Sequence, residues 1–203
     1  AAEDTRTARK LLAHHGIRNR LISYNDHNKA ARIPRLLHAL RDGDVALVSE
    51  GGTPVISDPG LDLVAAAVDA GFAVSPVPGP SAVTAALAVS GLPSRQFTYL
   101  GFLPRRAGER RRLFAALRDD PRAIVAFESP HRLRASLTAL RDTLGDRRVA
   151  VCRELTKKFE EVFRGTLSEA LERFAEPRGE FTLVIEGASA AAHAEPVEAS
   201  LED

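Results

Sequence analysis

Apolar residues recur along this chain at two spacings, and segments of the two kinds alternate. Spacings of three and four predict amphipathic helices, and short apolar runs bounded by turn residues predict buried strands. Leu133, Leu137 and Leu140, for example, lie along one stripe of a predicted helix. Helices are predicted over 5–15, 28–41, 61–70, 81–90, 106–118, 130–144 and 167–175, and strands over 45–48, 72–77, 97–103, 124–127, 148–155, 161–165 and 181–185.

This alternation predicts an α/β fold, because helices between strands are typical of layered α/β architectures. The segment 91–94, Gly-Leu-Pro-Ser, interrupts it as a linker. We therefore expect two α/β domains, over 1–93 and 94–187, with a ligand in the cleft between them. Residues 188–203 are mainly Ala, Ser and Glu, a composition that predicts a mobile tail.

Composition narrows the class of protein only slightly. The 203 residues are 44% hydrophobic and 27% charged, with a net charge of +1, which suits a globular protein and says nothing about nucleic acid. No apolar run approaches the length of a membrane span. The single cysteine, Cys152, lies in an apolar run and is predicted to be buried, and we expect a reducing, cytoplasmic setting.

Four loops follow predicted strands or precede predicted helices, where ligands of α/β sheets commonly bind. The first, 49–60, reads Ser-Glu-Gly-Gly-Thr-Pro-Val-Ile-Ser-Asp-Pro-Gly, and its glycines allow a ligand to approach the backbone. The alternative is an elaborate turn in which Asp58 caps the next helix. The other loops are 78–82 (Pro-Gly-Pro-Ser-Ala), 128–132 (Glu-Ser-Pro-His-Arg) and 153–160 (Arg-Glu-Leu-Thr-Lys-Lys-Phe-Glu).

Two of these loops carry groups suited to proton transfer. His131 can act as a general base near neutral pH, although a lone histidine is more often a capping or solvated residue. Glu128, Glu154 and Lys157 are further candidates; Arg153 and Glu154 can instead simply pair with each other. The chain has neither zinc-type ligand spacing nor a nucleophile elbow, so no metal is predicted.

Positive charge is concentrated between 105 and 112, which hold five arginines and one glutamate. Arginines in such a run contact phosphates and position a nucleic acid without reading its sequence. The alternative is an exposed basic helix face without a partner.

Taken together, the loops resemble one family more specifically than any single loop does. The ordered motifs are 3–6 (Glu-Asp-Thr-Arg), 26–28 (Asp-His-Asn), 49–54, 58–60, 78–82, 101–104 (Gly-Phe-Leu-Pro), 127–132 and 153–157. Over about 2–187 the chain resembles the ribosomal RNA small subunit methyltransferase I family, in the tetrapyrrole methylase superfamily. Members of that family 2′-O-methylate a cytidine of 16S rRNA.

The resemblance implies S-adenosyl-L-methionine as cofactor, 16S rRNA in the small ribosomal subunit as partner, and a homodimer. The implied catalytic residues are Glu128, His131, Glu154 and Lys157. The implied cofactor contacts are Ser49, Glu50, Gly51, Gly52, Thr53, Pro54, Ser81, Ala82, Phe127, Leu155, Thr156 and Thr182. The implied RNA contacts are Arg6, Arg105, Arg106, Arg110, Arg111 and Arg132.

Two alternatives remain open from the residues. One is a tetrapyrrole C-methyltransferase with the same cofactor, and the other is a non-catalytic RNA-binding module. In the family a strand, a Thr-Pro-Ile-Gly-Asn loop, a helix and a second strand precede the motif found here at 3–6. We expect such a leading segment to be missing from the first domain of this sequence.

Overall fold

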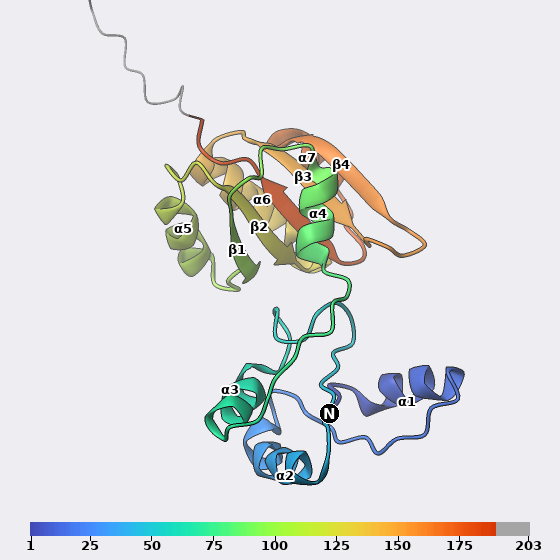
Figure 1. Ribbon diagram of the computed structural model, residues 1–203. Helices are drawn as coiled ribbons and strands as arrows, with labels where there is room; N and C mark the ends of the chain where they lie inside the picture. The colour runs from blue at the N-terminus through green and yellow to red at the C-terminus, as the bar shows by residue number, and fades with distance from the viewer. Residues whose placement is uncertain (190–203) are drawn as a thin grey trace, which may run out of the picture. The chain divides into compact units, whose positions relative to one another are not determined.

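Residues 1–189 are described by the computed structural model, in which the chain forms two compact units, one of Ala1–Ser81 and one that begins at Ala82 (Figure 1). The first unit holds α1 (Thr5–His14), α2 (Lys29–Asp42) and α3 (Leu61–Asp69). The second holds α4 (Ala82–Ser90), β1 (Phe97–Phe102), α5 (Ala107–Ala116), β2 (Ala123–Glu128), α6 (Pro130–Leu144), β3 (Arg148–Arg153), β4 (Glu161–Thr166), α7 (Leu167–Arg173) and β5 (Phe181–Ile185).

The second unit is built around a five-stranded sheet with the order β1-β2-β5-β3-β4. β1 is parallel to β2, whereas β5 is antiparallel to both of its neighbours and β4 is antiparallel to β3. β1, β2 and β3 therefore run in the same direction, and their carboxyl ends share one edge of the sheet with the start of β5. In α/β sheets this carboxyl edge is where ligands commonly bind.

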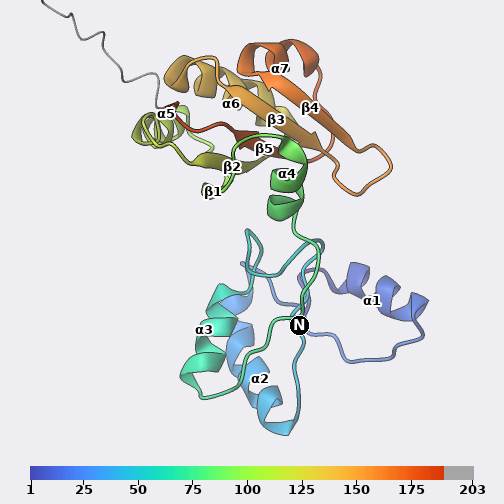
Figure 2. The same ribbon diagram turned by 45° about the horizontal axis from the view of Figure 1, so that its top comes forward.

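Both faces of this sheet are covered, which explains why its central strands read as continuous apolar runs. Alternate residues of the strands pack under α5, α6 and α7 in one cluster that includes Ile124, Leu137 and Leu183. The remaining residues pack under α4, which lies on the opposite face from α6 and α7 (Figure 2). Cys152 belongs to this second cluster and is buried as predicted, and burial raises the pKa of its thiol to about 11.

Helix α4 belongs to the second unit, although the linker at 91–94 suggested a boundary after it. Its apolar residues Val83 and Ala86 are buried against the sheet. The Arg164 side chain of β4 also donates to the Val89 carbonyl, with an Nε–O distance of 3.0 Å. The boundary between the units therefore falls between Ser81 and Ala82 rather than at 93/94.

Local signals define the ends of α6 and α7. Pro130 occupies the first turn of α6, where its missing N–H is not needed, and Gly145 ends that helix with φ of +82°. Thr166 and Glu169 form a reciprocal capping box at the start of α7. Sequence-local interactions thus fix where these two helices begin and where α6 ends.

The first unit has a small core, and its extended segments pair only through isolated bridges. Tyr24, Leu36 and Leu63 are its buried centre. Ala2 bridges Ser23 on one side and Val48 on the other, both in parallel orientation. Helix α1 contributes no buried residue to this core.

The strands predicted over 45–48 and 72–77 are wrong. Within the described residues, Val48 pairs only in its bridge with Ala2, and 72–77 has no strand partner. Val74 and Val77 are 48% and 89% exposed. A strand needs a neighbour for its N–H and C=O groups, and an apolar run alone does not supply one.

A mobile tail is predicted over 188–203, and its residues 190–203 lie outside the described part of the chain. Ala188, at its start, donates its N–H to the Asp120 carbonyl at 2.8 Å.

Candidate functional site

Glu128 is the last residue of β2, and its carboxylate contacts three residues of the segment that follows. Its side chain is fully buried and forms a 2.7 Å ion pair with Arg132. It also accepts hydrogen bonds from the Ser129 N–H (2.8 Å) and the Ser136 hydroxyl (2.5 Å). Both carboxylate oxygens are therefore engaged, and the contacts with Ser129, Arg132 and Ser136 fasten the first turns of α6 to the sheet. This placement suits an anchoring role better than proton transfer to a ligand.

His131, the next candidate, is exposed in the first turn of α6. The side chain of its neighbour Arg132 turns inward, donating to the Ser129 hydroxyl (3.0 Å) and the Leu103 carbonyl (2.9 Å) in addition to its ion pair with Glu128. Of the polar side chains of this loop, His131 is thus the one that is open to solvent and accessible to a ligand.

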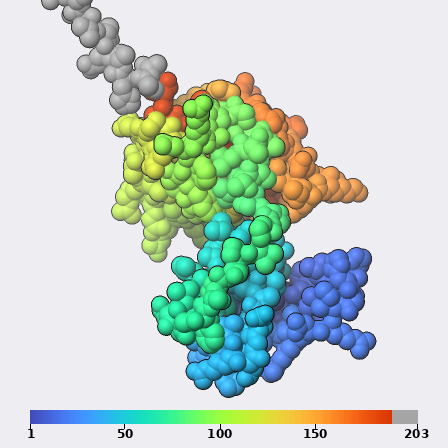
Figure 3. Space-filling model, viewed as in Figure 1, coloured from blue at the N-terminus to red at the C-terminus, as the bar shows by residue number. Residues whose placement is uncertain are grey.

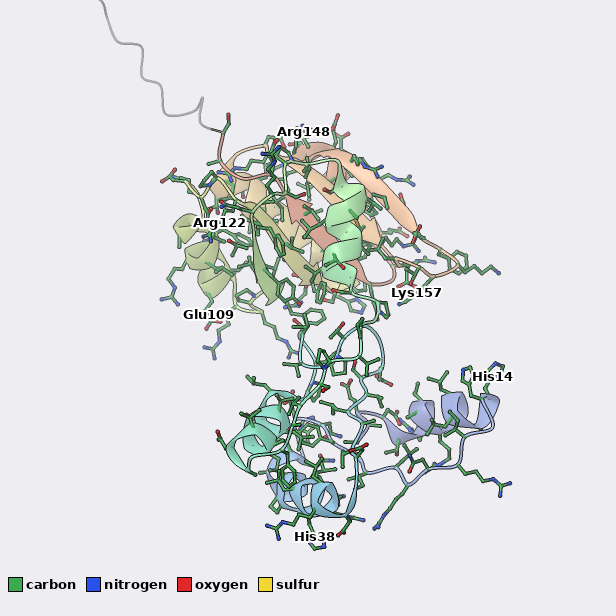
Figure 4. The ribbon with its side chains drawn as sticks, in the orientation of Figure 1. His14, His38, Glu109, Arg122, Arg148 and Lys157 are labelled. Atoms are coloured by element: carbon green, nitrogen blue, oxygen red, sulfur yellow. The ribbon has the colours of Figure 1, made fainter. Side chains whose placement is uncertain are left out.

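The loop between β3 and β4 contains a second ion-pair network. Lys157, which is labelled in Figure 4, belongs to this loop. Its Nζ lies 3.2 Å from a carboxylate oxygen of Glu154 and 2.7 Å from one of Glu180. Glu154 also accepts the Glu180 N–H at 2.8 Å. The alternative pairing of Glu154 with Arg153 does not occur: Arg153 pairs with Glu161 of β4 at 3.5 Å.

This network makes both candidates poor general bases, because it lowers the pKa of Glu154 and keeps Lys157 protonated. The hydrogen bond from the Glu180 N–H, followed by that from Lys157, lowers the pKa of Glu154. The hydrogen bond to Glu180 raises the pKa of Lys157, against an opposing effect of partial burial. Glu154 therefore stays a weakly basic carboxylate and Lys157 a cation.

Unusual backbone conformation marks the same loop. Glu154 and Thr156, neither of them glycine, have φ of +48° and +65°. Such residues cost of the order of 1–3 kcal/mol each and persist only where the surroundings enforce them. Gly179 lies against this turn, because a Cβ on it would come within 2.6 Å of Glu154 Cγ. No sequence pattern pointed to Gly179 or Glu180 as part of this arrangement, because both are distant from the loop in the chain.

Three of the predicted cofactor contacts gather on the α4 side of the sheet near its carboxyl edge. Phe127 pairs in register with Thr182 of β5, and Leu155 packs against the same cluster as Phe127. Tyr99 meets Phe127 edge to face, with ring centroids 5.4 Å apart. Phe127 and Leu155 are half-buried, so together they present an apolar floor with strand backbone at its border. Thr156 follows and is exposed.

In the first unit the two predicted cofactor loops touch each other. Thr53 donates its hydroxyl hydrogen bond to the Pro80 carbonyl at 3.1 Å, which joins the segment 49–54 to the segment 78–82. The glycines at 51 and 52 are exposed, and Gly52 has φ of +71°. The loop therefore presents accessible backbone at these two glycines.

Gly60 closes the first loop, and the structure explains why it is glycine. Its φ is +154°, and a Cβ would come within 2.7 Å of Val55 Cγ2 and 2.8 Å of Leu47 Cδ2. Gly60, not Asp58, is the N-cap residue of α3, and it makes no side-chain cap. Asp58 instead shares a hydrogen bond with Ser49.

Three carboxylates, Glu3, Glu50 and Asp58, lie close enough at this loop to affect one another, and the pKa values of Glu3 and Asp58 are raised. Burial first, and then the charge of Asp58, raises the pKa of Glu3. Burial likewise raises the pKa of Asp58, with Glu50 adding to the shift. Glu50 itself is exposed and accepts a hydrogen bond from the Thr7 hydroxyl at 3.3 Å. A cationic group placed here would relieve the repulsion.

The arginines predicted to contact RNA divide into two groups. Arg110 is only 7% exposed, and its guanidinium donates to the Ala135 carbonyl at 3.4 Å, so it joins α5 to α6 and is not available to a phosphate. Arg132 is committed to Glu128 as described above. Exposed side chains remain at Arg105, Arg106, Arg111 and Arg6. Arg106 is paired with Glu109 at 3.2 Å, and Arg6 is paired with Asp4 at 2.8 Å.

Among the described residues, no group of three or more His, Cys, Asp or Glu side chains is arranged to hold a metal ion. None of the helices in the described part of the chain is long and apolar enough to cross a membrane.

Comparison with known proteins assigns the fold. The family model of Tetrapyrrole (Corrin/Porphyrin) Methylases matches residues 2–171. A solved diphthine synthase superposes with a TM-score of 0.67 at 16% identity, covering 88% of this chain and 73% of that one. A Thermus thermophilus uroporphyrin-III C-methyltransferase, solved with S-adenyl homocysteine, gives 0.55 at 20%, covering 81% and 75%. The chain belongs to the tetrapyrrole methylase family.

Relatives then narrow the assignment within that family. Over 92% of this chain, it is 47% identical to a Thermotoga maritima protein, of which 85% is covered. It is also 47% identical over 92% of its length to a Halalkalibacterium halodurans protein, of which 66% is covered. Both are named Ribosomal RNA small subunit methyltransferase I, and these matches place the chain in that group. Measured against three such relatives, the chain spans 63–67% of their length.

Proposed function

We propose that this chain uses S-adenosyl-L-methionine to methylate the 2′-hydroxyl of a cytidine ribose in 16S rRNA. The observation that carries the proposal is the 47% identity with the T. maritima protein, which extends across both units.

The residues present fit the cofactor in both units. In the second unit, Phe127, Leu155 and Thr182 offer an apolar floor with strand backbone beside it, which suits a purine ring. In the first unit, the loop 49–54 offers accessible backbone beside carboxylates that favour a cation. When bound, the cofactor supplies a methyl group on a positively charged sulfonium.

The candidates for proton transfer differ in what their surroundings allow. His131 is open to solvent in the first turn of α6, and an imidazole is suited to accept a hydroxyl proton near neutral pH. Lys157, held as a cation by Glu154 and Glu180, suits electrostatic attraction of a phosphate or a developing oxyanion. We propose His131 as the base and Glu128 as the residue that positions its helix.

Arg105, Arg106 and Arg111 are the proposed phosphate contacts, because their side chains are exposed. Their contribution is positional and predicts strong salt dependence of RNA binding. Arg110, which is buried in the second unit, is not included.

The decisive experiment measures transfer of the cofactor's methyl group to 16S rRNA or to small ribosomal subunits, followed by nucleoside analysis for 2′-O-methylcytidine. We expect His131→Ala to reduce kcat about 100-fold or more, the usual contribution of general acid–base catalysis. The matched control is His38→Ala, an exposed histidine on α2, which should leave kcat unchanged.

Other outcomes distinguish the alternatives. Methylation of uroporphyrinogen in place of RNA would support a tetrapyrrole C-methyltransferase. RNA binding without calorimetric binding of S-adenosylmethionine would support a non-catalytic RNA-binding module. The homodimer and the cytoplasmic location implied by the family remain predictions, the first of which sedimentation of the purified chain would test.

A further inference from the structure

The loop that joins β3 to β4, residues 154–160, projects from the body of the second unit (Figure 3). Its most exposed apolar side chain is Phe159, which is 64% exposed. The neighbouring Lys158 places its Nζ 5.6 Å from the centroid of that ring. The loop therefore presents an aromatic ring and a cation together at its exposed end.

Hydrogen bonds within the loop hold this end in place. The Lys157 N–H donates to the Glu154 carbonyl at 3.0 Å, and the Glu160 N–H donates to the Lys157 carbonyl at 3.1 Å. The Thr156 N–H donates to the Glu160 carboxylate at 2.5 Å. A loop that carries two residues in the left-handed region and this many internal bonds is preorganised, which reduces the entropy lost on binding.

The charges of the loop leave one cation available. Glu154 is paired with Lys157, and Glu160 is bonded to the loop backbone. Within the described residues, Lys158 has no ion-pair partner, and its ammonium lies over the Phe159 ring. The loop therefore presents the unpaired Lys158 ammonium beside the exposed Phe159 ring, while the Glu160 carboxylate is turned toward the loop backbone.

Resting on the proposed function, we propose that Phe159 stacks on an unpaired base of the RNA substrate while Lys158 contacts the adjacent phosphate. Single-stranded RNA is recognised in this way, by aromatic side chains that stack on bases and by cations along the backbone. An exposed aromatic ring beside the unpaired Lys158 ammonium fits a base better than an apolar protein surface, which would leave that ammonium without a partner. The tip is thus a substrate contact outside the predicted set.

The chain contains no tryptophan, and this allows a direct test. Phe159→Trp introduces a single indole at the tip that retains stacking. We expect its fluorescence to be quenched by a single-stranded oligoribonucleotide of mixed sequence, and much less by the same sequence in a duplex. The matched control is Phe97→Trp, since Phe97 is 42% exposed at the start of β1, away from the carboxyl edge.

Kinetics and salt dependence give a second measurement. Removing one base stack costs about ten-fold in affinity, so Phe159→Ala should raise the KM for RNA by about that factor and leave the KM for S-adenosylmethionine unchanged. Phe159→Trp should restore the RNA KM. Lys158→Ala should reduce the slope of log affinity against log salt by about 0.7.

These outcomes separate this inference from the proposed function. Quenching by RNA in a chain that transfers no methyl group supports the tip contact and overturns the function. Normal methylation with an unchanged RNA KM in Phe159→Ala overturns the tip contact and leaves the function standing. A tryptophan signal that depends on protein concentration without RNA also overturns the contact, because the tip then binds a second copy.

Discussion

The two units of this chain differ in how much regular strand pairing they form, although both contain apolar runs of the same kind. In the second unit, each central strand has neighbours on both sides and a helical layer on each face. In the first unit, apolar runs of the same kind remain extended segments joined by isolated bridges, with a core centred on three buried side chains. Apolar patterning therefore specifies which residues can be buried, and the presence of paired neighbours decides whether they become a sheet.

The largest expected effect is a loss of stability of the second unit on substitution of Glu128. Glu128→Ala leaves Arg132 without its partner and removes the acceptor of the Ser136 hydroxyl. Breaking a buried ion pair in this way costs about 3–5 kcal/mol. Urea denaturation followed by circular dichroism should show the second unit unfolding at lower denaturant.

The control for this change is Glu172→Ala, an exposed glutamate on α7, which should alter stability by less than about 0.5 kcal/mol. If Glu128→Ala were as stable as the wild type and still lost methylation, Glu128 would act in the chemistry and not as the anchor of α6.

A smaller effect is expected in the first unit from Gly60→Ala. The added Cβ would meet Val55 and Leu47 side chains at a strained backbone angle, which costs about 1–3 kcal/mol. Hydrogen exchange should report faster opening of amides near α3 and unchanged protection in β2, β3 and β5.

Gly51→Ala is the matched control, because a Cβ added at Gly51 would have nothing within 4 Å of it. Should Gly60→Ala reduce protection in the second unit by the same amount, the two units would unfold together and not as separate bodies.

The smallest expected effect concerns an ion pair that occurs in both units with the same local sequence spacing. Asp120 with Arg122, and Asp4 with Arg6, are both carboxylates bonded to an arginine two residues later. The hydrogen bonds of the arginine lower the pKa of each carboxyl to about 2. A depressed pKa contributes stability above the usual value near 3.8, and this contribution is lost as the pH falls toward 2.

Asp120→Asn should therefore destabilise the second unit by about 0.5–1 kcal/mol at pH 6, and the difference from wild type should vanish near pH 2. Unfolding measured at both pH values checks this. A difference that persisted at pH 2 would show that backbone hydrogen bonding, and not charge, carries the contribution of Asp120.

Most of the secondary structure followed from the sequence, and the failures have a common cause. The predicted helices and the strands of the second unit are confirmed within a few residues, because capping residues and periodicity are local signals. The strands over 45–48 and 72–77 failed because strand pairing depends on distant segments. The predicted boundary at 91–94 assigned α4 to the first domain. The structure places α4 in the second unit, because its apolar residues are buried by a sheet that follows it in the chain.

The candidate site was predicted as a set of loops and not as a set of contacts. Loop chemistry identified Glu128 and Lys157, but not that Ser136 and Glu180 hold them, since these partners are eight and 23 residues away. The burial of Arg110 could not be predicted either. A run of arginines predicts a solvent-exposed helix face, and only the packing of α5 on α6 shows that one of them is buried.

The position of β5 has a consequence for synthesis of the chain. It follows every other strand of the second unit in sequence, yet it lies between β2 and β3 in space. Until residues 181–185 emerge during translation, β2 and β3 each expose an apolar edge with unpaired backbone groups. Such edges are templates for association with other chains. Nascent chains that stall before β5 should therefore depend on chaperones more than those that stall just after it.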